Sequence, residues 1–184
     1  MATLTAQQMG TEPMQHRREL ALEATQPLRE QPLGHFFGGQ SRPGVGPVSE
    51  VFEPGTGQLL GLLRDATEDE LEAAVAAARE AATAWAATPG DVRRKLLHRL
   101  ADLIVENAEK IAAVECLDAG QCWRFMSKAA LRGAENFRFF ADRAPTAADG
   151  QSLPTEDHLN FTSRRAIGPV AVITPWNTPF MLST

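Results

Sequence analysis

The strongest candidate for chemistry in this 184-residue sequence is the short segment Pro175-Trp176-Asn177. It follows the uninterrupted apolar run of residues 170–173, which predicts a strand buried on both faces of a parallel sheet. In open α/β sheets, ligands bind beyond the carboxyl ends of such strands. An amide at that place could donate a hydrogen bond to an oxyanion that develops during a reaction. The residue types leave a second interpretation equally open, in which Asn177 caps the turn and Trp176 packs in the core.

The other chemically capable side chains have simpler structural interpretations. Cys116 lies within a predicted helix, as expected for a small buried side chain. Cys122 lies near a helix start, where a thiol can become reactive, but no base is identifiable near it. No metal site is expected, because the histidines lack the spacing of metal ligands; they are His16, His35, His98 and His158.

Three glycines imitate a dinucleotide-binding fingerprint. Gly55, Gly57 and Gly61 have a last spacing that is one residue too long, and the residues after them are strand-like. Because no helix start would face a pyrophosphate there, the pattern predicts a hairpin. Its strands are residues 48–52 and 59–63, joined by the turn at residues 53–57.

Four amphipathic helices are predicted between this hairpin and Pro145. Thr67 and Glu70 form a capping box for the first, which stops before residues 89–90. The second carries its apolar stripe over residues 92–104. Asn107 can cap the third, which Gly120 ends. The fourth runs through residues 126–140. Beyond them, Leu159, Phe161 and Ser163 alternate with polar neighbours as in an exposed strand, and Thr178 with Pro179 predicts a helix start.

Composition narrows the class of protein. The chain is 43% hydrophobic and 22% charged with a net charge of −5, which is typical of a soluble globular protein and argues against nucleic-acid binding. No apolar run approaches the ~20 residues that cross a bilayer. Two cysteines and no leader pattern favour a reducing, cytoplasmic setting. Residues 1–33 are polar and are expected to form an N-terminal extension, mobile or packed on a partner, with a possible short helix over residues 15–25.

The predicted architecture is incomplete. A buried parallel strand needs neighbouring strands and covering helices, and the sequence supplies no second buried strand. Taken alone, the sequence therefore describes an α/β fold with a half-built sheet.

Residues 168–180 combine an apolar run with the motif Pro175-Trp176-Asn177-Thr178-Pro179. An apolar strand followed by Pro-Trp-Asn-x-Pro is the pattern of the NAD(P)-dependent aldehyde dehydrogenase superfamily, which this sequence resembles. The N-terminal hairpins of the superfamily are similar to residues 36–40 and 53–57. Its second helix is similar to residues 93–104, and its Glu-x-Leu-Asp-x-Gly turn to residues 115–120. Residues 136–142 and 159–162 resemble the dehydrogenases of hydroxymuconic-type semialdehydes.

The resemblance implies an α/β fold made of β-hairpins, a helical segment and the first strand of a Rossmann-like parallel sheet. Residues 34–184 would then form an incomplete N-terminal cofactor-binding domain of an aldehyde dehydrogenase. The resemblance also implies roles for individual residues. Asn177 matches the oxyanion-hole Asn, and Ile173, Thr174, Pro175 and Trp176 match the stretch beside the nicotinamide–ribose end of NAD or NADP. Thr178 replaces an aromatic residue common at the mouth of the substrate tunnel, which implies a wider or more polar pocket. The substrate implied is a small-molecule aldehyde, and the parent enzyme would be a homodimer or homotetramer.

The resemblance also implies what this chain lacks. The family's catalytic Cys, general-base Glu, pyrophosphate-binding helix and ribose-binding Lys correspond to positions beyond Thr184. Neither Cys116 nor Cys122 matches the nucleophile, so the 184-residue chain alone is expected to be inactive. An alternative hypothesis is a non-catalytic interaction module derived from the same fold, which would pair with another chain through residues 170–173.

Overall fold

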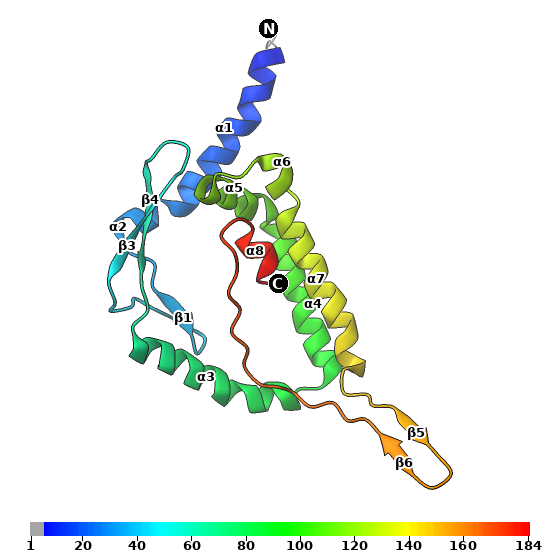
Figure 1. Cartoon of the computed structure of the whole chain (residues 1–184). Helices are drawn as coiled ribbons and strands as arrows, with labels where there is room; N and C mark the ends of the chain where they lie inside the picture. Colours follow the sequence, from blue (N-terminus) through cyan, green and yellow to red (C-terminus); the bar gives the residue numbers. More distant parts are fainter. Residues whose placement is uncertain (1–5) are drawn as a thin grey trace.

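The computed structural model describes residues 6–184 of the chain. An N-terminal helix leads into two hairpins, a helical region follows, and a third hairpin and a last short helix complete the order (Figure 1). The elements are α1 (Ala6–Thr25), α2 (Pro27–Glu30), β1 (His35–Phe37), β2 (Gln40–Arg42), β3 (Val48–Phe52), β4 (Leu59–Arg64), α3 (Glu68–Ala87), α4 (Gly90–Glu106), α5 (Ala108–Ala119), α6 (Trp123–Met126), α7 (Ala129–Arg143), the 3₁₀ turn η1 (Ala144–Thr146), β5 (Ser152–Pro154), β6 (Leu159–Phe161) and α8 (Pro179–Leu182).

The described strands form three two-stranded antiparallel sheets, β1-β2, β3-β4 and β5-β6. The glycine-rich stretch is a hairpin turn, as predicted, because β3 and β4 pair from Val48 opposite Arg64 to Phe52 opposite Leu59. Within that turn Gly57 has a φ of +70°, a left-handed conformation that glycine adopts without a steric cost. The dinucleotide interpretation of these glycines is therefore excluded by the fold.

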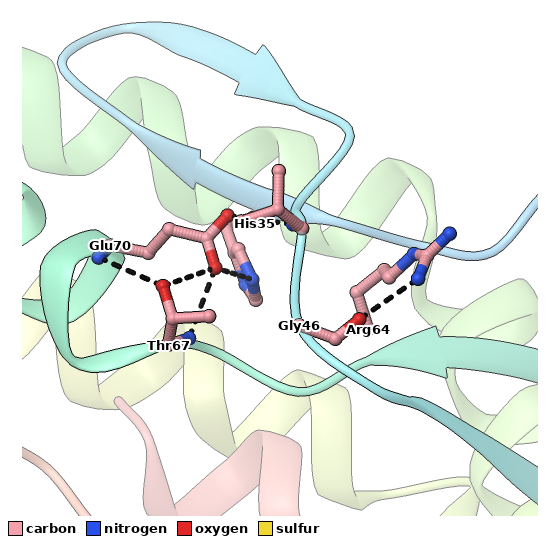
Figure 2. A network of polar contacts seen from close by, with 6 residues as sticks. His35, Gly46, Arg64, Thr67 and Glu70 are labelled. Atoms are coloured by element: carbon pink, nitrogen blue, oxygen red, sulfur yellow. Dashed lines mark hydrogen bonds and ion pairs between the residues drawn. The ribbon is translucent and has the colours of Figure 1, made fainter.

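The predicted capping box at the start of α3 is confirmed, and it also fastens the hairpin region to that helix (Figure 2). Glu70 Oε2 accepts from the Thr67 backbone N–H at 3.0 Å, and Thr67 Oγ1 accepts from the Glu70 N–H at 3.3 Å. The Val45 N–H donates to Glu70 Oε1 at 3.0 Å. Hydrogen bonds from the Thr67 backbone, then from its hydroxyl and from Val45, hold the pKa of Glu70 below its usual range.

Two of the predicted helix boundaries differ in detail. Gly120 ends α5 with a φ of +65°, as predicted, but Asn107 does not cap that helix with its side chain. Its Nδ2 donates instead to the Leu103 carbonyl at 2.8 Å and so closes α4. The expected fourth helix is divided at residues 127–128 into α6 and α7.

The described core consists of three small clusters rather than one large one. The first joins Ala21 of α1 to Leu60, Ala113 and Leu117, the second joins α4 to α7, and the third joins α5 to α6 and α7. The predicted helix over residues 15–25 is confirmed as part of the longer α1. It packs against α5 of the same chain, where a mobile or partner-bound segment was expected. The division at residue 33 stays a prediction.

The expected buried strand over residues 170–173 is not formed. The chain runs from residue 162 to residue 175 without regular secondary structure, and the side chain of Ile173 is 95% exposed. The reason is that a parallel strand takes its hydrogen bonds from neighbouring strands, and none of the described strands pairs with this segment. The expected exposed strand near Leu159 is confirmed as β6, although Ser163 lies outside it. Among the described helices, none is long and apolar enough to span a bilayer.

Candidate functional site

The candidate site is the turn at residues 175–178, which connects the irregular segment to α8. Thr178 precedes α8 and Pro179 occupies its first turn, as predicted, but the Thr178 side chain makes no capping hydrogen bond. Instead, the Phe180 N–H donates to Glu115 Oε1 at 3.0 Å, from α5. A carboxylate from a distant helix therefore provides the acceptor that a capping residue normally supplies.

Glu115 is a buried carboxyl group, with only 6% of its surface exposed. Its Oε2 is buried and has no hydrogen-bond partner among the described residues. Burial raises the pKa of Glu115, the Phe180 N–H lowers it, and Asp118 raises it further. Burial has the largest effect on this pKa, which means that a charged carboxylate at this position costs free energy.

The rest of α8 lies on the α4–α7 pair (Figure 1). The Phe180 side chain packs on the cluster of Ala101, Ile104, Ala130 and Ala134. A Cβ at Gly133 of α7 would lie 3.1 Å from Thr184 and 3.3 Å from the Phe180 ring, so a glycine permits this close approach. Asn136 Nδ2 donates to Thr184 Oγ1 at 3.1 Å. Both ends of α8 are therefore fixed by α5 and α7.

Two cavities border this turn. One of about 650 Å³ includes Lys110, Glu115 and Thr174 in its lining. The other, of about 540 Å³, is lined by Thr178, Met181 and the cationic side chains of Arg124, Lys128 and Arg132. Thr174 and Thr178 therefore face different cavities.

The predicted site residues thus lie on this turn and at the two positions before it, and only some of them are partly enclosed. Thr174 and Thr178 are half-buried, whereas Pro175 and Asn177 are exposed and Trp176 is 74% exposed. The core-packed alternative for Trp176 is wrong in this chain. Three roles remain predictions. They are the oxyanion hole for Asn177, the nicotinamide–ribose end of the cofactor for Ile173, Thr174, Pro175 and Trp176, and the mouth of the substrate tunnel for Thr178.

Sequence reasoning missed the contact of Glu115 with α8 and the position of the three cationic side chains beside Thr178. Glu115 stands four residues after Ile111, on the apolar stripe of the third predicted helix, and a carboxylate on such a stripe is a detectable signal. Lys128 and Arg132 are also four residues apart, on one face of the region around α7. Their placement beside Thr178 depends on tertiary structure.

Comparison with known proteins identifies the family. The profile of the aldehyde dehydrogenase family matches residues 43–184. The chain belongs to the aldehyde dehydrogenase family.

Several relatives of this aldehyde dehydrogenase chain act on semialdehydes according to their names. It is 38% identical to the 5-carboxymethyl-2-hydroxymuconate semialdehyde dehydrogenase of Escherichia coli, over 71% of this chain and 28% of that protein. It is 35% identical to the 2-hydroxymuconic semialdehyde dehydrogenase of Pseudomonas sp. (strain CF600), over 82% of this chain and 32% of that protein. The resemblance to this group is confirmed, and the chain spans about 30% of the length of these relatives.

Solved structures confirm the partial fold. HpcC from Thermus thermophilus superposes with a TM-score of 0.84 at 38% identity, covering 90% of this chain and 32% of that one. PnpE in complex with nicotinamide adenine dinucleotide gives a TM-score of 0.74 at 34% identity, covering 80% of this chain and 31% of that one. The hairpins and helices of this chain thus match about 30% of an aldehyde dehydrogenase structure.

Proposed function

We propose that this chain serves as the N-terminal portion of an enzyme that oxidises an aldehyde to a carboxylate with NAD(P)⁺. The observation that carries the proposal is the Pro175-Trp176-Asn177 turn, held between α5 and α7 in a chain of this family. Asn177 donates its side-chain amide hydrogen bond to the oxyanion that forms when a thiolate attacks the aldehyde. This stabilises the charge that develops in the transition state.

The exposed side chains before Asn177 fit one end of a dinucleotide. Ile173 and Trp176 offer apolar surface, while Pro175 restricts the backbone and Thr174 lines a cavity. We assign to these residues the nicotinamide–ribose end of NAD or NADP, and PnpE, one of the solved relatives, contains the dinucleotide. A nicotinamide bound there would supply the hydride acceptor that oxidation of an aldehyde requires.

A semialdehyde that carries carboxylate groups is the substrate class we propose. The cavity beside Thr178 is lined by Arg124, Lys128 and Arg132, and no acidic side chain among the described residues lines it. Guanidinium and ammonium groups at such a cavity favour carboxylate groups of a substrate. The names of the E. coli and Pseudomonas relatives agree with this choice.

The cytoplasmic location and the homodimer or homotetramer stay proposals. The β5-β6 hairpin supports assembly with a second subunit, because Leu153, Leu159 and Phe161 are all more than half exposed on it.

The Asn177→Ala substitution, made in the full-length enzyme that carries this segment, tests the proposed function. Loss of one oxyanion-hole donor typically lowers kcat by about 10²–10³-fold. We expect a decrease of that order at saturating aldehyde, with an unchanged unfolding temperature. Gln58→Ala is the control, because it removes an exposed amide side chain from the connection between β3 and β4. An unchanged kcat would remove Asn177 from the oxyanion role.

We also infer that the 184-residue chain alone oxidises no aldehyde. Its two cysteines are Cys116 and Cys122. Burial, and then the neighbouring Glu115, raise the pKa of the Cys116 thiol, which disfavours the thiolate. Assay of the purified chain with NAD⁺ or NADP⁺ and a semialdehyde is expected to give no NAD(P)H absorbance above buffer. Turnover that exceeds buffer would contradict this inference.

A further inference from the structure

The first free N–H of α8 has an acceptor 65 residues away in the sequence. Pro179 has no N–H, so Phe180 carries the first backbone donor of α8. The Thr178 hydroxyl does not accept it, although a threonine at this position commonly would. Glu115 Oε1 accepts it at 3.0 Å. The start of α8 is thus tied to α5 by a hydrogen bond between a carboxylate and a backbone amide.

Glu115 lies on a helix, α5, that core packing holds in place. Its neighbours on α5, Ala112, Ala113 and Leu117, are all buried, so the helix cannot shift without disturbing two core clusters. Glu115 is itself 6% exposed, and its second oxygen has no hydrogen-bond partner among the described residues. A leucine would fill this place without the cost of burying a carboxyl group. The carboxyl group accepts a hydrogen bond from the Phe180 N–H, and a leucine could not do so.

The connection from Phe180 back to Asn177 is short and stiff. Two residues separate them, and one of these is Pro179, whose φ is fixed by its ring. A shift of the Phe180 amide is therefore passed on to the Asn177 backbone. Misplacement of a catalytic group by about 1 Å can lower a rate by about 10²-fold.

We propose that Glu115 is a positioning residue, which sets the place of the Asn177 amide through its hydrogen bond to the Phe180 N–H. The proposal rests on the proposed oxyanion role of Asn177. It requires the reach and the acceptor oxygen of the Glu115 side chain, and it does not require its negative charge.

Two conservative substitutions test separately whether the length or the charge of the Glu115 side chain matters. Glu115→Gln keeps the length and one acceptor oxygen, whereas Glu115→Asp keeps the charge but withdraws the oxygens by one methylene. In the full-length enzyme that carries this segment, we expect Glu115→Gln to keep kcat within about 3-fold and Glu115→Asp to lower kcat by about 10-fold or more. The KM for NAD(P)⁺ should stay unchanged in both. The reverse order of the two variants would show a role for the charge and would overturn the proposal.

Combination with Asn177→Ala tests the coupling. If Glu115 acts through Asn177, Glu115→Asp lowers kcat no further in the Asn177→Ala enzyme. Decreases that multiply independently would overturn the proposal. If Asn177→Ala alone leaves kcat unchanged, the proposed function fails instead.

Amide hydrogen exchange in the 184-residue chain gives a readout that needs no activity. The Phe180 amide should exchange slowly in the unsubstituted chain and in Glu115→Gln, and rapidly in Glu115→Asp. The amide of Ile111, which bonds to the Asn107 carbonyl at the start of α5, is the internal reference. Equal protection of the Phe180 amide in all three chains would refute the anchoring hydrogen bond itself.

Discussion

At the scale of single residues, Glu53 shows how a turn carboxylate becomes a tertiary anchor. It lies at the start of the β3-β4 turn and is 6% exposed. Both of its oxygens accept from Arg18 of α1, one of them from Nη2 at 2.7 Å, and Thr56 Oγ1 donates to Oε2 at 2.7 Å. The Arg18 hydrogen bond, more than any other effect, holds the pKa of Glu53 below its ordinary value of 4.5. Glu53 thereby links α1 to the hairpin.

The Glu53→Gln substitution is expected to weaken the fold and to change its pH dependence. A depressed pKa in the folded state means that stability is present above pH 4.5 and is lost as the pH falls toward the folded-state pKa. Urea denaturation should show this loss in the unsubstituted chain and a flatter profile in Glu53→Gln. At pH 7 the variant should lose about 1–3 kcal/mol of unfolding free energy, as for a buried charged hydrogen bond.

Glu50→Gln is the matched control, because Glu50 lies on the same hairpin but is exposed. It should leave both the unfolding free energy and its pH profile close to those of the unsubstituted chain. Identical acid profiles for the unsubstituted chain and Glu53→Gln would mean that Glu53 does not contribute to the pH dependence.

Sequence separation explains which residue roles could be predicted. The Thr67–Glu70 capping box was found because its two members are three residues apart. The Arg18–Glu53 and Glu115–Phe180 contacts join residues 35 and 65 positions apart, and no local pattern connects them. Asn177 was singled out for chemistry by its place after an apolar run, but the helix that fixes the turn could not be known from that run.

At the scale of elements, prediction succeeded where both partners are close in the chain. The strands β3 and β4 were found because a short turn joins them, and the helices because each carries its own apolar stripe. The expected strand over residues 170–173 failed for the opposite reason. Its apolar pattern describes a buried parallel strand, but the strands it would pair with are not among the described elements.

Gly90 offers a test of how α4 meets the end of α7. An alanine in a helix is normally favoured over glycine by about 1 kcal/mol. At Gly90, however, a Cβ would lie 2.6 Å from the Ala144 carbonyl oxygen and 2.6 Å from the Pro145 Cα, both in the backbone of η1. Because neither atom can swing aside, we expect Gly90→Ala to destabilise the chain by about 1–3 kcal/mol despite the helix preference.

The control for Gly90→Ala is Gly55→Ala, in the β3-β4 turn. There the nearest atom to an added Cβ is Glu53 Oε1 at 3.9 Å, an ordinary contact distance. Thermal unfolding followed by circular dichroism should show a lower midpoint for Gly90→Ala and little change for Gly55→Ala. A raised midpoint for Gly90→Ala would indicate that α4 and η1 separate easily.

At the scale of the whole molecule, many large apolar side chains among the described residues are exposed. The described core is built mainly from alanines, and no large side chain among the described residues is completely buried. Five large apolar side chains in the irregular segment and the turn after it are each at least 63% exposed: Ile167, Val170, Val172, Ile173 and Trp176. The chain spans 28% to 32% of the length of the two relatives named above. These side chains form an exposed apolar surface in this chain.

The exposed apolar side chains of residues 167–176 are available to bind other apolar surfaces. We therefore expect the 184-residue chain to bind a hydrophobic fluorescent dye and to elute from a sizing column as a self-associated species. The double substitution Val170→Asp with Ile173→Asp should reduce both signals while leaving the helical circular dichroism unchanged, because these side chains support no described core cluster. Leu71→Asp, which changes a 57% exposed side chain on α3, should leave both signals intact. Equal dye binding and elution in all three chains would mean that another surface of the molecule causes the dye binding and the self-association.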